Sequence, residues 1–194
     1  LAVIDIQKLF LTDKKSPWYD RKLISIVPNV EKLIKAIGIR NVIFTRFIPP
    51  KNWQDEHGSW RTYYRINQKI TRNVLGTDSL NLIDALQPYT PNLSRVSDRK
   101  KSASVFTAGS FHSKIKKKST KFLIFTGIET DYCVLSSVLD AIHLGYYVIV
   151  VIDSCASSKK NGQKNALGIF ERFPEQLWIT STKELLKQDR KSVV

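Results

Sequence analysis

The stretch FLIFTGIETDYC (residues 122–133) combines a buried strand with a reactive side chain a few residues beyond its end. Residues 122–126 are almost continuously apolar, as expected of a strand covered on both faces of a parallel sheet. A second such run, 147–152, follows after residues 131–144, whose apolar side chains recur with the spacing of a helix. Two buried strands joined by a helix predict a parallel sheet covered by helices.

The same alternation extends outward along the chain. Further strands are predicted at 1–5, 41–45, 93–96 and 177–180, and helices between Pro28 and Gly38, at 78–86, at 161–172 and from Thr182. Residues 46–76 are polar and aromatic with little periodicity, which indicates a long binding loop. We therefore predict one domain over residues 1–194, with a three-layer α/β/α, Rossmann-like and mainly parallel sheet.

Composition limits the class of protein. A hydrophobic share of 42% and a charged share of 25% are ordinary for a globular domain. There is no run of roughly 20 apolar residues and no secretory signal pattern. Because the chain begins within a strand and contains no Met, we expect the natural N-terminus to lie further upstream. Two cysteines that follow separate predicted strands favour a reduced, cytoplasmic protein.

The formal net charge of +14 raises the hypothesis of nucleic-acid binding. However, the lysines are spread along the chain, and the one dense cluster, at 114–121, is typical of the solvated face of a short helix. No zinc-finger spacing or aromatic RNA-binding signature accompanies them. We predict neither a nucleic-acid nor a membrane partner, while an anionic ligand or surface stays open.

An acid and a thiol stand at the ends of two predicted strands. Asp5 closes the first strand, and Cys133 begins the helix after residues 122–126. In an open parallel sheet, carboxyl ends of strands and adjoining helix starts form the reaction crevice. A helix start favours the thiolate, and its N–H groups can stabilise an oxyanion. The alternatives are a loop-capping acid and a small buried thiol, and the latter is our interpretation of Cys155.

Several segments together resemble a known family. They are Asp5-Ile6-Gln7 with Phe10, residues 100–106, GIETDYCV at 127–134, residues 145–151 and 153–158, and Arg172-Phe173. This combination is similar to the isochorismatase-like cysteine hydrolases, a group that includes nicotinamidases and carbamoyl-amide hydrolases. The resemblance implies that family's hydrolase fold, a small-molecule substrate and a homo-oligomer, either a dimer or a tetramer.

The resemblance also implies a catalytic triad of Asp5, Lys100 and Cys133. The spacing to Ser104 and Phe106 favours Lys100, and its neighbour Lys101 is the alternative. The family carries a non-proline cis peptide, here Ile128–Glu129, which would turn the Glu129 N–H beside that of Cys133 as an oxyanion hole. Glu129 stands where many relatives have a small residue, so its side chain is expected either to narrow or to charge the pocket.

The metal ligands of nicotinamidase-like relatives have no counterpart here. The corresponding stretch, TRFIPP at 45–50, has neither an acid nor an imidazole, and His57 is interpreted as a solvated loop residue. We therefore predict no metal and no cofactor. The candidate substrate-binding residues are Gln7, Phe10, Trp60 and Tyr132, drawn from a larger aromatic set that also holds Phe47, Trp53 and Tyr64. Arg46 is either a contact for an anionic group or a surface residue.

These inferences converge on a metal-independent cysteine hydrolase that cleaves an amide or carbamoyl C–N bond through a thioester. Hydrolysis of the vinyl ether of isochorismate is an alternative within the same family, although that reaction needs no thiol. A non-catalytic basic binding protein on the same fold is the alternative from another class.

Overall fold

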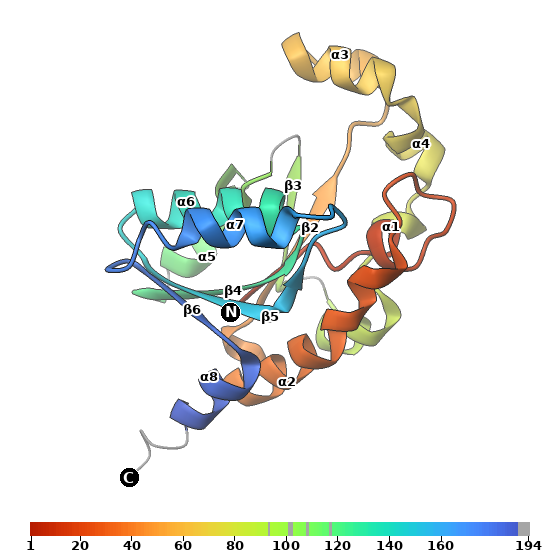
Figure 1. Cartoon of the computed structure of the whole chain (residues 1–194). Coiled ribbons are helices and arrows are strands. Elements are labelled where there is room, and N and C mark those ends of the chain that lie inside the picture. The colour runs from red at the N-terminus through yellow and green to blue at the C-terminus, as the bar shows by residue number, and fades with distance from the viewer. Residues whose placement is uncertain (93, 101–102, 108, 117, 190–194) are drawn as a thin grey trace.

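A six-stranded parallel sheet forms the centre of the protein (Figure 1). The computed structural model describes residues 1–92, 94–100, 103–107, 109–116 and 118–189. In the order β3-β2-β1-β4-β5-β6, the strands are Val96–Lys100, Ile43–Ile48, Ala2–Ile4, Phe122–Ile128, Tyr147–Ala156 and Leu177–Thr180. All five pairings are parallel.

Helices cover both faces of this sheet, which confirms the three-layer α/β/α prediction. The helices are α1 (Lys8–Leu11), α2 (Val27–Ile37), α3 (Gly58–Ile66), α4 (Arg72–Leu75), α5 (Gly109–Lys116), α6 (Leu135–His143), α7 (Gly162–Phe170) and α8 (Thr182–Asp189). Figure 1 shows α5, α6 and α7 on one face and α2 and α8 on the other. Successive side chains of a strand point to opposite faces of the sheet and pack in two separate cores. Ile4 packs in the core with α5, α6 and α7, and Val3 packs in the core with α2.

The strand order creates a topological switch point between β1 and β4. The chain proceeds outward from β1 to β2 and β3, then returns to the other side of β1 for β4, β5 and β6. Ligands of such sheets bind in the crevice outside the carboxyl ends of the strands where the order reverses. A functional site is therefore expected in this crevice.

The prediction of a long binding loop over residues 46–76 was wrong about its structure: 46–48 belong to β2, and helices occupy much of residues 49–76. They contain α3, α4 and two short 3-10 turns, and form an arm that projects beyond the sheet (Figure 1). Tyr64 of α3 is fully buried and packs with Phe47 and Ile70. The two helices were missed because α3 has nine residues and α4 four, too few to repeat an apolar pattern. In addition, the buried residue of α3, Tyr64, is aromatic instead of aliphatic.

Other boundaries also differ from the predictions. The expected helix at 78–86 is two 3-10 turns, Asp78–Leu80 and Asp84–Tyr89. The strand expected at 93–96 starts only at Val96 and continues to Lys100 as β3. The helix expected at 131–144 begins as one turn of π-helix, Thr130–Val134, before it continues as α6. The hydrogen bonds of these turns join residues three to five apart, and the local apolar pattern does not distinguish such turns from a regular α-helix.

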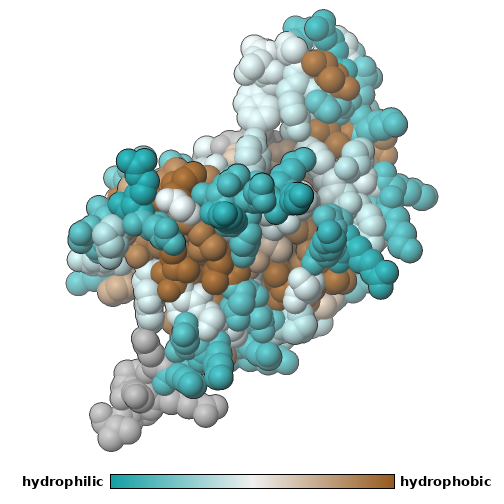
Figure 2. Space-filling view, viewed as in Figure 1, coloured by the Kyte–Doolittle hydropathy of each residue, from teal (hydrophilic) through white to brown (hydrophobic). Residues whose placement is uncertain are grey.

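The basic surface is dispersed. In α5, Phe111 and Ile115 are buried while Lys116 is exposed, as predicted for the lysine-rich helix. Hydrophilic side chains extend over much of the visible face and the arm (Figure 2). Within the described residues, no helix combines the length and apolar character needed to cross a membrane.

Candidate active site

The topology brings the three predicted catalytic residues to the same edge of the sheet. Asp5 directly follows β1, which pairs with β4 through Ile4 and Gly127. Strand β4 leads into the π-helical turn that contains Cys133. Lys100 is the last residue of β3, two strands from β1. Its side chain, and all of Lys101, lie outside the described part of the structure, so the identity of the triad lysine stays a prediction.

Asp5 is a buried carboxylate in an unusual backbone conformation. Its side chain is inaccessible to solvent, and its φ angle is +51°, a region that residues other than glycine rarely adopt. Thr45 of β2 donates a hydrogen bond from Oγ1 to Asp5 Oδ1 over 2.8 Å. A buried acid held by a neighbouring strand has a fixed direction, which suits a general base.

Replacing Thr45 with valine is expected to lower the free energy of unfolding by about 1–3 kcal/mol, because a buried acid then loses a donor of matched shape. Urea denaturation followed by circular dichroism measures the change. Thr45→Ser is the matched control, because it keeps the hydroxyl and should recover most of the lost stability. Equal losses in the two variants would contradict a role for this hydrogen bond.

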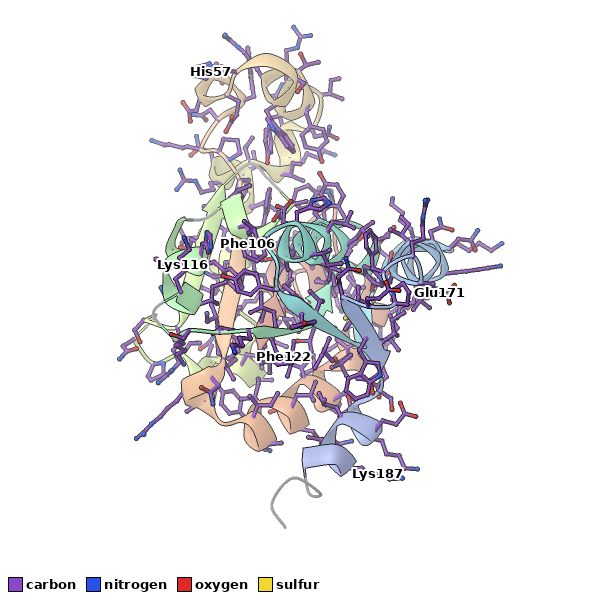
Figure 3. The ribbon with its side chains drawn as sticks, turned by 90° about the vertical axis from the view of Figure 1, so that its left-hand side faces the viewer. His57, Phe106, Lys116, Phe122, Glu171 and Lys187 are labelled. Carbon is purple, nitrogen blue, oxygen red and sulfur yellow. The ribbon has the colours of Figure 1, made fainter. Side chains whose placement is uncertain are left out.

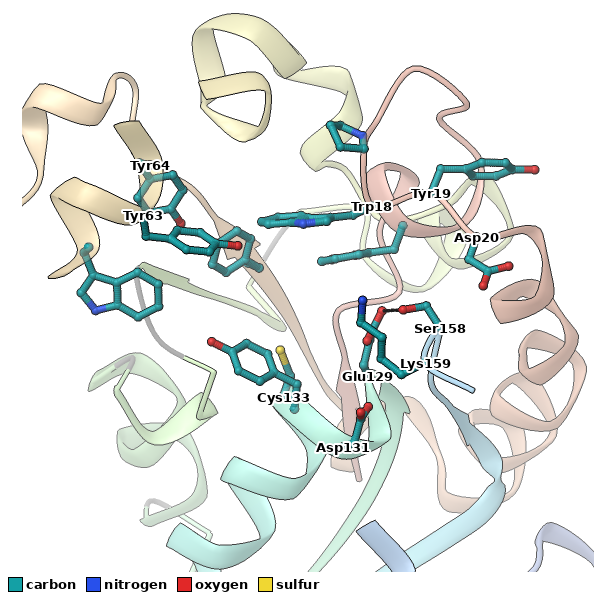
Figure 4. Close-up of a pocket in the computed structure, with 15 residues that line it drawn as sticks. Trp18, Tyr19, Asp20, Tyr63, Tyr64, Glu129, Asp131, Cys133, Ser158 and Lys159 are labelled. Atoms are coloured by element: carbon teal, nitrogen blue, oxygen red, sulfur yellow. Dashed lines mark hydrogen bonds between the residues drawn. The ribbon is translucent and has the colours of Figure 1, made fainter. Parts of the chain in front are cut away.

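Cys133 lines a cavity of about 510 Å³ at the crevice. Its side chain is largely buried, with only 6% of the residue exposed, and neither it nor Cys155 forms a disulfide. Figure 4 shows Cys133 and Glu129 on one side of this pocket, and Trp18, Tyr63 and Tyr64 on the opposite side. The thiol is thus shielded from bulk water yet accessible from the cavity.

Aromatic side chains from distant segments form the pocket walls. Of the residues predicted to bind substrate, Phe10, Trp60 and Tyr132 all line the cavity. Phe10 stacks on Trp18, with ring centroids 5.6 Å apart and planes 9° from parallel. Trp60 meets Tyr63 edge-on at 5.7 Å. Such walls favour a planar or apolar ligand group.

Two other residues considered for substrate binding, Gln7 and Arg46, already use their polar groups in contacts within the protein. Gln7 is fully buried: its amide N–H groups donate to the carbonyls of Phe47 and Leu80 at 3.0 and 2.8 Å, and its oxygen accepts from the Phe47 N–H at 2.7 Å. It is not among the residues that line the pocket, and it joins segments behind the wall instead. Arg46 makes two 2.7 Å contacts with Asp98, so its guanidinium already has an anionic partner.

Glu129 brings a carboxylate into the pocket. The Ile128–Glu129 peptide bond is cis, and the Glu129 side chain lines the cavity. Ser158 donates a hydrogen bond from Oγ to Glu129 Oε1 at 2.6 Å, drawn as a dashed line in Figure 4. Burial raises the pKa of the Glu129 carboxyl, and the Ser158 hydrogen bond opposes part of that rise. The assignment of its backbone N–H to an oxyanion hole stays a prediction.

Cys155 is positioned differently from Cys133. It lies within β5, although the sequence suggested that the strand ends before it, and only 4% of the residue is exposed. Burial raises the pKa of the Cys155 thiol to about 12, because the interior disfavours the charged thiolate. At neutral pH this cysteine is therefore a packed thiol and not a nucleophile.

Several pocket residues escaped the sequence analysis. Trp18, Tyr63, Ser158 and Lys159 line the cavity together with the predicted set. A signal existed for Tyr63, because Trp60 and Tyr63 are three residues apart and share one helical face. Trp18 stands in an irregular segment and had no such signal.

Metal-ligating side chains do not gather in the described residues. No group of three or more His, Cys, Asp or Glu side chains there is arranged to hold a metal ion. His57 is exposed at the start of α3, and Figure 3 shows it at the far end of the arm. The absence of a metal or other cofactor stays a prediction.

Together, the fold and site define a Rossmann-like α/β protein with a cysteine in its crevice. The isochorismatase domain family matches residues 1–184. Isochorismatase family protein 1B of Dictyostelium discoideum is 34% identical over 89 residues, which make up 43% of this chain and 43% of that protein. A ureidoacrylate amidohydrolase of Methylorubrum extorquens is 27% identical over 195 residues, covering 89% of this chain and 76% of the relative.

The chain belongs to the isochorismatase family. A cysteine hydrolase from Pseudomonas syringae shares its fold, with a TM-score of 0.81 at 21% identity, over 98% of this chain and 91% of that chain. These similarities confirm the resemblance found in the sequence and support the prediction of a hydrolase. The match spans less than half of the Dictyostelium protein.

Proposed function

We propose that this protein is a cysteine hydrolase that cleaves the C–N bond of a small amide or carbamoyl compound. The observation that carries the proposal is the position of Cys133, whose thiol lines a cavity at the switch point of the sheet. Asp5 is a buried acid that directly follows β1, the strand that pairs with β4. A thiol and a base in one shielded crevice are the requirements of nucleophilic acyl transfer.

The first half-reaction forms a thioester. Asp5 takes the proton of the Cys133 thiol, and the sulfur attacks the carbonyl carbon of the substrate. Lys100 balances the charge of the carboxylate, and the Glu129 and Cys133 N–H groups stabilise the oxyanion. The C–N bond then breaks, and protonated Asp5 gives its proton to the departing amine.

The second half-reaction restores the enzyme. Asp5 takes a proton from water, and the resulting hydroxide attacks the thioester carbon. The C–S bond breaks, and the sulfur leaves as the thiolate and regains a proton from Asp5 as the acid product departs. The walls contributed by Phe10, Trp18 and Trp60 exclude bulk water while the substrate is bound. The proposal assigns no step to a metal ion.

Ammonia release from a panel of small carboxamides and N-carbamoyl compounds tests this proposal. Acid quenching during turnover should trap an acyl-enzyme, and peptide mass analysis should locate the added mass on Cys133. Cys155 is an internal control, because its raised pKa keeps it unreactive at neutral pH. Isochorismate in the same panel distinguishes the vinyl-ether reaction, which would release product without an acyl-enzyme. Turnover of amides with no mass on Cys133 would contradict the thioester mechanism.

A further inference from the structure

The pocket has the opposite charge balance to the rest of the protein. The chain carries a formal net charge of +14. Among the described residues that line the pocket, however, three are acidic (Asp20, Glu129 and Asp131) and one, Lys159, is basic. At physiological ionic strength, charges separated by more than about 8–10 Å are largely screened, so the dispersed surface lysines contribute little inside the cavity.

The three acids differ in how their carboxylates are held. Asp20 already accepts a hydrogen bond from the Lys22 N–H at 2.9 Å, as the cap of a 3-10 helix. The Asp131 carboxylate lies against Gly162 at the start of α7, and its buried Oδ1 has no hydrogen-bond partner among the described residues. Glu129 accepts a hydrogen bond from neutral Ser158 and makes no ion pair within 4 Å among the described residues, although the positive charge of nearby Lys159 opposes part of the rise that burial causes in the pKa of its carboxyl.

The opposite wall offers the matching surface for a cation. Trp18, Trp60, Tyr63 and Tyr64 present aromatic rings to the cavity, and the faces of such rings attract ammonium and guanidinium groups. The Tyr64 side chain is fully buried, and its hydroxyl has no hydrogen-bond partner among the described residues. The hydroxyl is itself buried, so Tyr64 belongs to the pocket wall without offering this oxygen to the cavity (Figure 4).

We propose that this pocket selects substrates whose leaving or acyl portion carries a positive charge, such as an ammonium or guanidinium group. The cation would lie between the Glu129 carboxylate and the aromatic wall. Carboxylate-bearing amides, such as the ureido acid in the name of the Methylorubrum relative, would be disfavoured here. The choice of substrate rests on the proposed hydrolase function, whereas the charge preference of the pocket can be measured without it.

Charged thiol reagents measure that preference directly at Cys133. The probes are the cationic (trimethylammonio)ethyl, the anionic sulfonatoethyl and the neutral methyl methanethiosulfonates. In each reaction the Cys133 thiolate attacks the sulfenyl sulfur, a mixed disulfide forms, and methanesulfinate leaves with the electron pair of the broken S–S bond. Rates are divided by those of free mercaptoethanol, which removes the intrinsic reactivity of each reagent.

In the wild type, the normalised rate with the cationic reagent should be about ten times the normalised rate with the anionic reagent, as expected for a cleft in which one sign of charge predominates. Glu129→Gln should reduce this ratio several-fold, and Lys159→Gln should raise it. Glu171→Gln removes an equal charge from an exposed position at the end of α7 (Figure 3) and should leave the ratio unchanged.

A wild-type ratio at or below one, or a ratio that Glu129→Gln leaves unaltered, would overturn the proposal. Should Glu129→Gln not fold, raising NaCl from about 0.05 to about 0.5 M on the wild type replaces it, since screening should move the ratio toward one. A ratio independent of salt counts against the proposal. A Cys133 that reacts with none of the reagents contradicts both this inference and the hydrolase function.

Matched amides separate the two proposals. Meta-(aminomethyl)benzamide, meta-ethylbenzamide and meta-carboxybenzamide differ mainly in charge. The expected order of kcat/KM is cationic, then neutral, then anionic, with about tenfold between the first two. Hydrolysis in the reverse order overturns the charge preference and leaves the hydrolase function intact. No hydrolysis of any of the three, together with a high reagent ratio, argues against these amides as substrates and supports the charge preference.

Discussion

Replacing Cys133 with alanine should reduce amide hydrolysis to the background rate, a loss on the order of 10⁴-fold or more in kcat, as is typical when a nucleophile is removed. The reason is that the proposed thioester cannot form without the sulfur, and no other described pocket residue is a thiol. Steady-state ammonia release from a confirmed substrate measures the effect.

Cys155→Ala is the matched control for this experiment. It removes the other thiol of the chain from the interior of β5, where burial raises its pKa to about 12. We expect it to keep most of the activity at a modest cost in stability. If Cys133→Ala retained activity while Cys155→Ala lost it, the assignment of the nucleophile would be wrong.

Replacing Gly127 with alanine should lower the free energy of unfolding by about 4 kcal/mol or more, which is exceptional for a single substitution. Gly127 has a φ angle of +115°, and it lies in β4 directly against β1. A Cβ atom there would overlap the carbonyl oxygen of Ile4 and come within 2.7 Å of the Ile4 nitrogen. Both obstacles are backbone atoms, so no side-chain rotation can relieve the clash.

Urea denaturation followed by circular dichroism measures this loss, and Gly168→Ala is its control. Gly168 lies within α7, has no heavy atom within 4 Å of the added Cβ, and does not need a positive φ. Alanine is the better helix former there, so a gain of up to about 1 kcal/mol is expected. A Gly127→Ala protein as stable as the wild type would show that β1 and β4 can separate without penalty.

The consequences of Gly127 extend to the site. The close approach of β1 and β4 positions Asp5, at the end of one strand, beside the segment that leads to Glu129 and Cys133. Glycine is therefore needed at this position for the proposed base, Asp5, to lie close to the segment that carries the proposed nucleophile, Cys133.

Local patterns in the sequence determined the class of fold and predicted the principal site residues. The continuous apolar runs at 122–126 and 147–152 identified the start of β4 and of β5 to the residue, because strands buried on both faces are apolar throughout, although both strands continue beyond the predicted ends. The Pro28–Gly38 signals correctly delimited α2. The motif around Cys133 pointed to the correct family and predicted the nucleophile, since those residues are contiguous and need no knowledge of the fold.

Tertiary structure alone decided which distant residues meet. The strand order brings Asp5 next to β4, and the arm brings Trp60 and Tyr64 over Cys133. Gln7 was predicted to contact substrate, but its amide is consumed by the backbone of two other segments. The neighbours of Glu129 in the pocket, Asp131, Ser158 and Lys159, were likewise set by packing between β4, β5 and the segments that follow them. Periodicity reports which face of an element is buried, whereas these contacts join segments far apart in the chain and exist only after the sheet has assembled.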